Sequence, residues 1–144
     1  MFTTPVTNDD LENMEGLRFC PMTFQEKVPK ALELRTTIIG HRVFTAAVDS
    51  QTLEGSTYDW RKEGRALVKN WQPYDLPEDI EKKLLKLMAY FGLNYRAIDI
   101  IVTPDGCHVF LEVNPVGEFF GMEIYPPHYP ISQAIAEVLL TNKN

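Results

Sequence analysis

The chain has 144 residues, of which 44% are hydrophobic and 24% are charged, and its formal net charge is -6. This length and composition suit one globular domain with a sizeable core. The acidic balance argues against a general nucleic-acid binder, which needs a basic face. Because the sequence has no apolar stretch of roughly 18 residues, we expect no membrane partner.

The amino-terminal third predicts an irregular start followed by a hairpin. Residues 3–16 are rich in Thr, Asn, Asp and Glu and read as irregular, and residues 19–30 form a short extended run interrupted by prolines. Residues 32–51 contain Thr, Ile, Val and Phe, which favour strands, on both sides of a Gly40-His41 turn, and this predicts a β-hairpin. Residues 52–77 then form a long polar connection.

The remainder predicts two helices and a second hairpin. Residues 77–91 combine Pro77, an acidic first turn and an apolar stripe, and Gly92 follows as a stop. Residues 95–114 read as a hairpin, and residues 130–141 as a terminal helix. The predicted fold class is α+β, with a mostly antiparallel sheet and helices on one face.

The second hairpin determines which side chains share a face. Asp105-Gly106 is a strong signal for a two-residue turn. This turn would set Pro104 opposite Cys107 and, counting outward, Asp99 opposite Glu112. The predicted core face carries Ile98, Ile100, Val102, Val109, Leu111 and Val113. The other face carries Asp99, Glu112 and Asn114, with Ile101 and Phe110 further along.

Two carboxylates directly opposite each other on paired strands repel, so something should offset their charge. Mg²⁺ does this well, because it takes carboxylate and amide oxygens and bridges to substrate phosphates. Two alternatives stay open from the spacing alone. The acids can be held apart by water on a solvated face, or they can share one proton.

A magnesium-phosphate site also needs cationic groups. Arg35 lies within the first predicted hairpin, and Arg61 lies in the motif YDWRKE of the long connection. Glu33 would project from the same strand face as Arg35, which offers a carboxylate for a ligand hydroxyl beside a cation for its phosphate. The alternatives are solvent-exposed arginines and a surface ion pair between Glu33 and Arg35.

Several ordered motifs together resemble the C-terminal part of the ATP-grasp ligases, and more narrowly the maturases of microviridin-type peptides (graspetides). These motifs are CPMTFQEKVPKALELRTTIIGHRVFTAAVDSQ, DWR, LNYRAIDIIVTPDGCHVFLEVNPVGEF and PISQAIAEVL. The resemblance covers nearly the whole chain. It implies an enzyme that uses ATP and Mg²⁺ in the cytoplasm. The two cysteines belong to no CxxC or Cys/His zinc pattern, and a disulfide between them stays open although nothing in the sequence supports it, so a reducing cytosol is the default.

The resemblance also assigns roles by position. It implies that Gln25, Glu26 and the Val28 backbone border the adenine, and that Glu33 binds ribose hydroxyls. Arg35 and Arg61 would be the catalytic arginines that bind ATP phosphates or the acyl phosphate. The implied metal ligands are Asp99, Glu112 and Asn114.

The implied reaction activates an Asp or Glu side chain of a ribosomal precursor peptide as an acyl phosphate. Ser, Thr or Lys then captures it as an ester or an amide. Residues 1–24 contain no lysine and a single glycine, so we expect the N-terminal pre-grasp and lid subdomains of such ligases to be absent. We therefore expect the isolated chain to be inactive or weakly active, with a missing N-terminal half or further copies of the chain as partners.

Two other functions stay open. The chain could serve another ATP-grasp carboxylate-amine ligase, glutathione-synthetase-like or glutamate-adding. Alternatively, it could be a truncated non-catalytic module that binds nucleotide or peptide.

Overall fold

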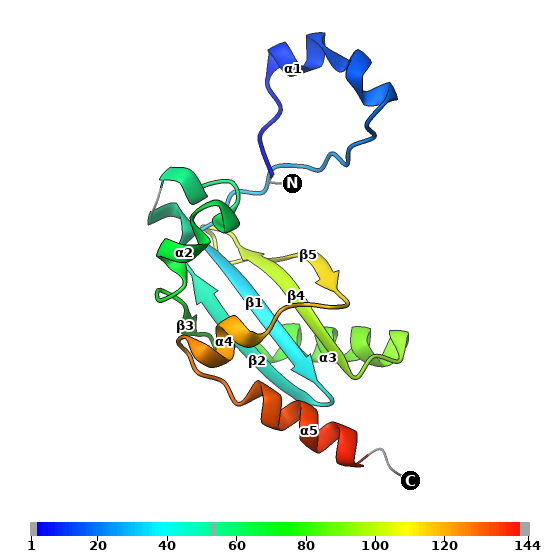
Figure 1. The fold of residues 1–144 in the computed structure, drawn as a ribbon, viewed down its shortest axis with the longest axis vertical. Coiled ribbons are helices and arrows are strands. Elements are labelled where there is room, and N and C mark those ends of the chain that lie inside the picture. Colours follow the sequence, from blue (N-terminus) through cyan, green and yellow to red (C-terminus); the bar gives the residue numbers. More distant parts are fainter. Residues whose placement is uncertain (1–2, 53, 142–144) are drawn as a thin grey trace.

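The computed structural model describes residues 3–52 and 54–141. These residues form a five-stranded antiparallel sheet with helices against it, so the predicted α+β class is confirmed (Figure 1). The sheet order is β3-β2-β1-β4-β5. The strands are β1 (Leu32–Ile39), β2 (Arg42–Val48), β3 (Gln72–Pro73), β4 (Tyr95–Val102) and β5 (His108–Asn114).

The first hairpin begins at the predicted residue and has the predicted turn, but it ends at Val48 rather than at residue 51. Strands β1 and β2 pair antiparallel from Glu33 opposite Val48 to Ile39 opposite Arg42. Gly40 has a φ of 59°, a left-handed conformation that glycine adopts without steric cost. Strand β1 is central in the sheet, because it pairs with β2 on one side and β4 on the other.

Helices cover both faces of the sheet, so the expectation that they lie on one face is wrong. Helix α3 (Glu78–Phe91) packs Leu84 and Met88 against one face, together with Leu34 and Ile98. Helices α4 (Phe120–Ile124) and α5 (Ile131–Thr141) lie on the opposite face (Figure 1). The physical reason is that β1 and β2 bury apolar side chains on both faces, as the near-continuous hydrophobic runs of fully covered strands do.

The two predicted helices are confirmed, and their ends follow local rules. Helix α3 follows Pro77 and has three acidic residues in its first turn, which favours the positive end of the helix dipole. Gly92 ends it in the left-handed conformation, with a φ of 63°. None of the helices in the described ranges is long and apolar enough to cross a membrane.

The second hairpin confirms the pairing of Asp99 with Glu112 but not the predicted turn. Gly106 donates a backbone hydrogen bond to the Thr103 carbonyl and has a φ of 85°, so the loop is wider than two residues. Val102 therefore lies opposite His108 and Ile100 opposite Phe110, one residue out of the expected register. A bulge beside Asp99 and Ile100 restores the register, and Asp99 meets Glu112.

Because of this bulge, residues of β5 lie on different faces of the sheet from those predicted. Phe110 pairs with Ile100 and so lies on the α3 face, whereas Val109 pairs with Ile101 on the face of Asp99. Leu111, which was also expected in the core, lines the groove beside Glu112. The alternation rule failed here because one extra residue exchanges the two faces of a strand.

The amino-terminal segment is more regular than expected. A short helix, α1 (Asn8–Glu12), begins with a capping box between Thr7 and Asp10, and a 3₁₀ turn (Met14–Arg18) follows. Residues 19–30 contain no strand. The remaining short elements begin just before the connection expected over 52–77. They are 3₁₀ turns at Ser50–Thr52, Glu54–Ser56 and Trp60–Glu63, then α2 (Gly64–Leu67) and β3. In Figure 1 the segment with α1 loops out beyond the N-terminal end of β1.

Candidate functional site

The candidate site is an open groove on the sheet face that also carries α4 and α5. Strands β1, β4 and β5 contribute its floor, the connection after β2 contributes one wall, and the amino-terminal segment contributes another. Among the lining residues are seven of the predicted site residues, with one further acid and one lysine beside them. They are Gln25, Lys30, Glu33, Arg35, Asp59, Arg61, Asp99, Glu112 and Asn114.

The three predicted metal ligands lie together. Asp99 pairs with Glu112 across β4 and β5, and Asn114 lies two residues further along the same face. The Asn114 side-chain Nδ2 donates to Asp99 Oδ2 at 2.7 Å and to Glu112 Oε1 at 3.1 Å. One amide group therefore joins both carboxylates and offsets part of their repulsion.

Arg35 supplies the positive charge nearest to these acids. Its Nη1 lies 2.9 Å from both Oδ1 and Oδ2 of Asp99, and its Nη2 donates to the Glu118 carbonyl at 3.4 Å. Burial raises the pKa of Asp99 above its ordinary value, although the Arg35 charge and hydrogen bonds oppose that rise. The strand pairing explains the contact, because Arg35 is the β1 partner of Asp99.

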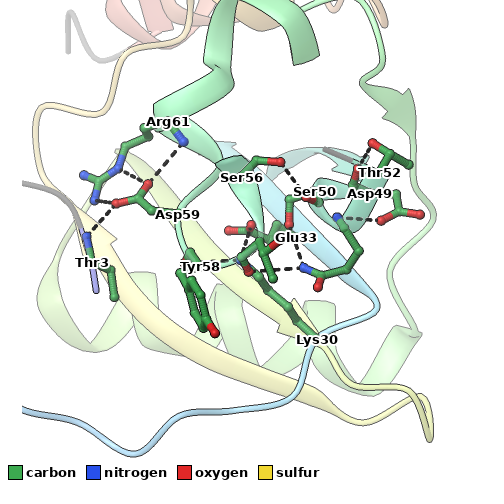
Figure 2. Close-up of polar contacts among 12 residues, drawn as sticks. Thr3, Lys30, Glu33, Asp49, Ser50, Thr52, Ser56, Tyr58, Asp59 and Arg61 are labelled. Carbon is green, nitrogen blue, oxygen red and sulfur yellow. Dashed lines mark hydrogen bonds and ion pairs between the residues drawn. The ribbon is translucent and has the colours of Figure 1, made fainter. Parts of the chain in front are cut away.

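Arg61 is bound by an acid that the sequence analysis had not singled out. Asp59 is buried, with 3% of its side chain exposed, and it accepts hydrogen bonds from Arg61 Nε at 2.8 Å and Nη2 at 2.6 Å (Figure 2). Hydrogen bonding to Asp59 raises the pKa of Arg61, and the charges of Glu112 and Asp99 raise it further. Arg61 therefore lies within electrostatic range of the paired acids.

Glu33 pairs with Lys30 rather than with Arg35. Lys30 Nζ lies 2.6 Å from Glu33 Oε1 and 3.3 Å from the Tyr58 carbonyl (Figure 2). Both charged side chains are largely buried, with 9% of Lys30 and 14% of Glu33 exposed. The alternative of a surface ion pair between Glu33 and Arg35 is therefore wrong, and the Lys30–Glu33 pair also connects β1 to the loop that carries Tyr58.

The three residues expected to border the adenine do not all line the groove. Gln25 lines the groove, whereas Glu26 and Val28 are not among its lining residues. All three lie in the segment before β1 that has no regular secondary structure. Their role at the base stays a prediction.

Gly117 is another residue whose importance the sequence analysis missed. A β-carbon there would overlap the Ala97 methyl and lie 3.0 Å from Arg35 Nη2. The Tyr95 hydroxyl donates to the Gly117 carbonyl, which holds this loop against β4. The glycine in the motif NPVGEF was the available signal, since a close backbone approach requires glycine.

The donor set suits a hard divalent cation. Two carboxylates and one side-chain amide share one face, and oxygen ligands of these types are those that Mg²⁺ takes in proteins. Within residues 3–52 and 54–141, no three His, Cys, Asp or Glu side chains form a group that could hold a metal. The Asn114 amide would therefore have to supply the third protein oxygen.

Among known proteins, only solved structures match this chain. No family model and no curated protein matches the chain. The macrocyclase MdnC from Microcystis aeruginosa MRC, solved with precursor peptide MdnA, shares 61% identity with a TM-score of 0.83. A RiPP-associated ATP-grasp ligase from Chryseobacterium gregarium, solved with ADP and a leader and core peptide, shares 40% identity with a TM-score of 0.93.

A third similar structure is the macrocyclase MdnB from Microcystis aeruginosa MRC, with 36% identity and a TM-score of 0.66. The three alignments cover 98%, 100% and 95% of this chain but 40%, 43% and 47% of the solved chains. The chain thus spans less than half the length of the proteins that it matches. The order of the motifs, the sheet and these alignments together show that the chain is similar to a part of the RiPP-associated ATP-grasp ligases.

Proposed function

We propose that the chain is the C-terminal, nucleotide- and metal-binding part of an ATP-grasp ligase that modifies a ribosomal precursor peptide. The observation that carries the proposal is the common face of Asp99, Glu112 and Asn114, with Arg35 in contact with Asp99. Acids and arginines gathered on one groove floor suit a ligand that combines phosphates with a divalent cation. The ADP in the Chryseobacterium ligase supports the same choice.

Asp99, Glu112 and Asn114 would hold Mg²⁺. When bound, this ion would neutralise phosphate oxygens as charge shifts between them in the transition state. Asn114 would present its Oδ1, which requires its amide to turn from the orientation in which Nδ2 faces both acids. The chemistry of the side chains therefore fits the ion after one local rearrangement.

Arg35 and Arg61 would bind the phosphate oxygens of ATP or of the acyl phosphate. Both guanidinium groups now bind carboxylates, Arg35 that of Asp99 and Arg61 that of Asp59. A planar guanidinium meets phosphate oxygens in pairs, so either arginine can hold a phosphate in a fixed orientation. Glu33 would accept hydrogen bonds from the ribose while Lys30 holds it through Oε1.

The reaction would begin when a substrate carboxylate oxygen attacks the γ-phosphorus of ATP and ADP leaves. A hydroxyl or amine of the same peptide would then attack the acyl carbon, lose its proton and displace phosphate. The product is an ester or an amide, and the peptide loses one water overall. The precursor peptides in the structures of the Microcystis and Chryseobacterium proteins support such a partner. ATP and nascent peptides both occur in the cytoplasm, so we propose that the protein acts there.

The test is a chimera in which this chain replaces the matching part of the Microcystis macrocyclase MdnC, incubated with MdnA and ATP. Mass spectrometry should show ATP-dependent loss of water from the peptide. The loss should disappear in the Asp99→Asn and Glu112→Gln variants, while Arg42→Gln keeps it. A folded chimera that binds nucleotide and peptide without consuming ATP would show a binding module instead.

A further inference from the structure

The contact between Arg35 and Asp99 occupies the carboxylate that the proposed metal site needs. A single nitrogen, Nη1, lies 2.9 Å from both carboxylate oxygens. The pair is only partly open to solvent, with 17% of the Arg35 side chain and 23% of the Asp99 side chain exposed. A cation cannot approach both oxygens along the same direction while the guanidinium remains there.

Asn114 also faces these acids with the wrong group for a metal. Its Nδ2 donates to Asp99 and Glu112, and a nitrogen that carries two hydrogens cannot be a ligand of Mg²⁺. Arg35, Asn114 and the two acids therefore form a chain of hydrogen bonds in which both carboxylates accept hydrogen bonds from nitrogen donors without a metal. Metal binding must open it at two points.

We propose that Arg35 competes with the divalent cation for Asp99, and that phosphate binding draws Arg35 away, so that phosphate and metal bind with positive coupling. This inference rests on the proposed function, since it assumes that Asp99 is a metal ligand and Arg35 a phosphate ligand. Each ligand breaks the Arg35–Asp99 contact, which hinders the binding of the other ligand. Phosphate offers Arg35 a replacement partner, and the metal offers Asp99 one. By linkage, the two ligands must strengthen each other by the same factor.

Arg61 makes a useful contrast within the same groove. Its counter-ion is Asp59, a buried acid that is not a predicted metal ligand and that also accepts the backbone N–H of Arg61 at 3.1 Å. Arg61 can therefore meet a phosphate without leaving a metal ligand. The competition is specific to Arg35, because its counter-ion alone belongs to the acid pair.

The test uses the 144-residue chain and Mn²⁺ alone, with free Mn²⁺ measured by electron paramagnetic resonance. Four variants are compared with the unchanged chain: Arg35→Gln, Arg61→Gln, Arg42→Gln and Asp99→Asn. Arg35→Gln should tighten Mn²⁺ binding by about tenfold, within the usual range for coupled sites. Arg61→Gln also removes one positive charge near the same acids, but it should tighten Mn²⁺ binding clearly less than Arg35→Gln does. Arg42 pairs with Glu137 outside the groove, and its variant should bind as the unchanged chain does.

Equal gains for Arg35→Gln and Arg61→Gln would show a general charge effect and overturn the competition. No gain for Arg35→Gln, with binding still lost in Asp99→Asn, would overturn it while leaving the metal site intact. If Asp99→Asn changes nothing, the metal assignment in the proposed function fails as well. These results separate the two failures.

A second measurement needs no substitution at Arg35, which protects the test against a variant that does not fold. Mg²⁺ is added to the unchanged chain while the side-chain NMR signals of Arg35 Nε and of the Asn114 amide are followed. Both should shift together with one saturation curve. Saturation of the Asn114 signal with no change at Arg35 would contradict the proposal.

Discussion

Both carboxylate oxygens of Asp59 bind the guanidinium of Arg61, at 2.8 Å from Nε and 2.6 Å from Nη2. The acid is almost completely buried, whereas 53% of the arginine side chain is exposed. Asp59 also accepts backbone hydrogen bonds from Thr3 and Arg61. One buried carboxylate thus connects the amino-terminal segment, the turn at Trp60–Glu63 and a groove arginine.

Replacing Asp59 by asparagine should lower the free energy of unfolding by about 2 kcal/mol at pH 7. Burial alone would raise the pKa of Asp59, but hydrogen bonds from Arg61 and Thr3 lower it from 3.8 to about 2. A shift of one pKa unit corresponds to about 1.4 kcal/mol. Because the folded-state pKa is depressed, this stability is present above about pH 4 and is lost as the pH falls toward 2. Urea unfolding at several pH values measures both effects.

The control for this prediction is Asp79→Asn. Asp79 pairs with Lys83 on the exposed surface of α3, where solvent screens the interaction. Its replacement should have little effect at any pH. A similar loss for both variants would show that the burial of Asp59 does not matter.

Replacing Arg35 by lysine in a complete enzyme should reduce turnover by about a hundredfold or more. Lysine keeps the charge but presents it as a point on a flexible stem, so it cannot grip a phosphate in a fixed orientation. The loss should appear in kcat more than in KM, because the contact strengthens as charge develops during transfer. Steady-state kinetics of the MdnC chimera measures both constants. Arg42→Lys should be nearly silent, and wild-type turnover for Arg35→Lys would refute the role of Arg35.

Gly117→Ala should destabilise the protein by about 1–3 kcal/mol, the usual cost of overpacking. The new methyl would overlap the Ala97 side chain and press on Arg35. Adding Ala97→Gly should recover most of the loss, since it removes the overlapping methyl. Gly121→Ala is the matched control, because a β-carbon there meets nothing within 4 Å. Thermal unfolding of the four proteins decides the matter, and a stable Gly117→Ala protein without the rescue would contradict the packing.

Thr36 and Thr45 form a buried hydroxyl pair across β1 and β2, with their Oγ1 atoms 3.0 Å apart. Changing either threonine to valine leaves the other hydroxyl without this partner, which should cost about 1–3 kcal/mol. Changing both should cost clearly less than the sum, since valine matches the shape of threonine and no polar partner remains. A double-mutant cycle from urea denaturation measures the coupling. Additive losses would mean that the hydroxyl pair contributes nothing.

Much of the fold could be predicted because its signals are local. Gly40, Gly92 and the apolar stripe of α3 each determine a boundary by their own chemistry. The pairing of Asp99 with Glu112 was also predicted correctly, but only because two departures from the assumed strand register cancel each other. The loop around Gly106 shifts the register by one residue, and the bulge at Leu111 shifts it back.

The contacts of the charged side chains could not be predicted in the same way. Glu33 pairs with Lys30 rather than Arg35, because Arg35 lies opposite Asp99 on the neighbouring strand. That neighbour follows from the sheet order, which brings β4 next to β1 and which no local pattern contains. Asp59 was missed for a related reason. Its burial depends on the path of the connection and of the amino-terminal segment.

The sheet order also has a consequence for how the groove forms during folding. Arg35 and Asp99 are separated by 64 positions in the chain, whereas β1 and β2 are joined by a tight turn. The first hairpin can form early, but β4 must close a long loop before it can pair with β1. Folding intermediates that contain only the hairpin therefore lack the groove floor. Refolding monitored by a groove probe should lag behind hairpin formation and finish together with the whole sheet.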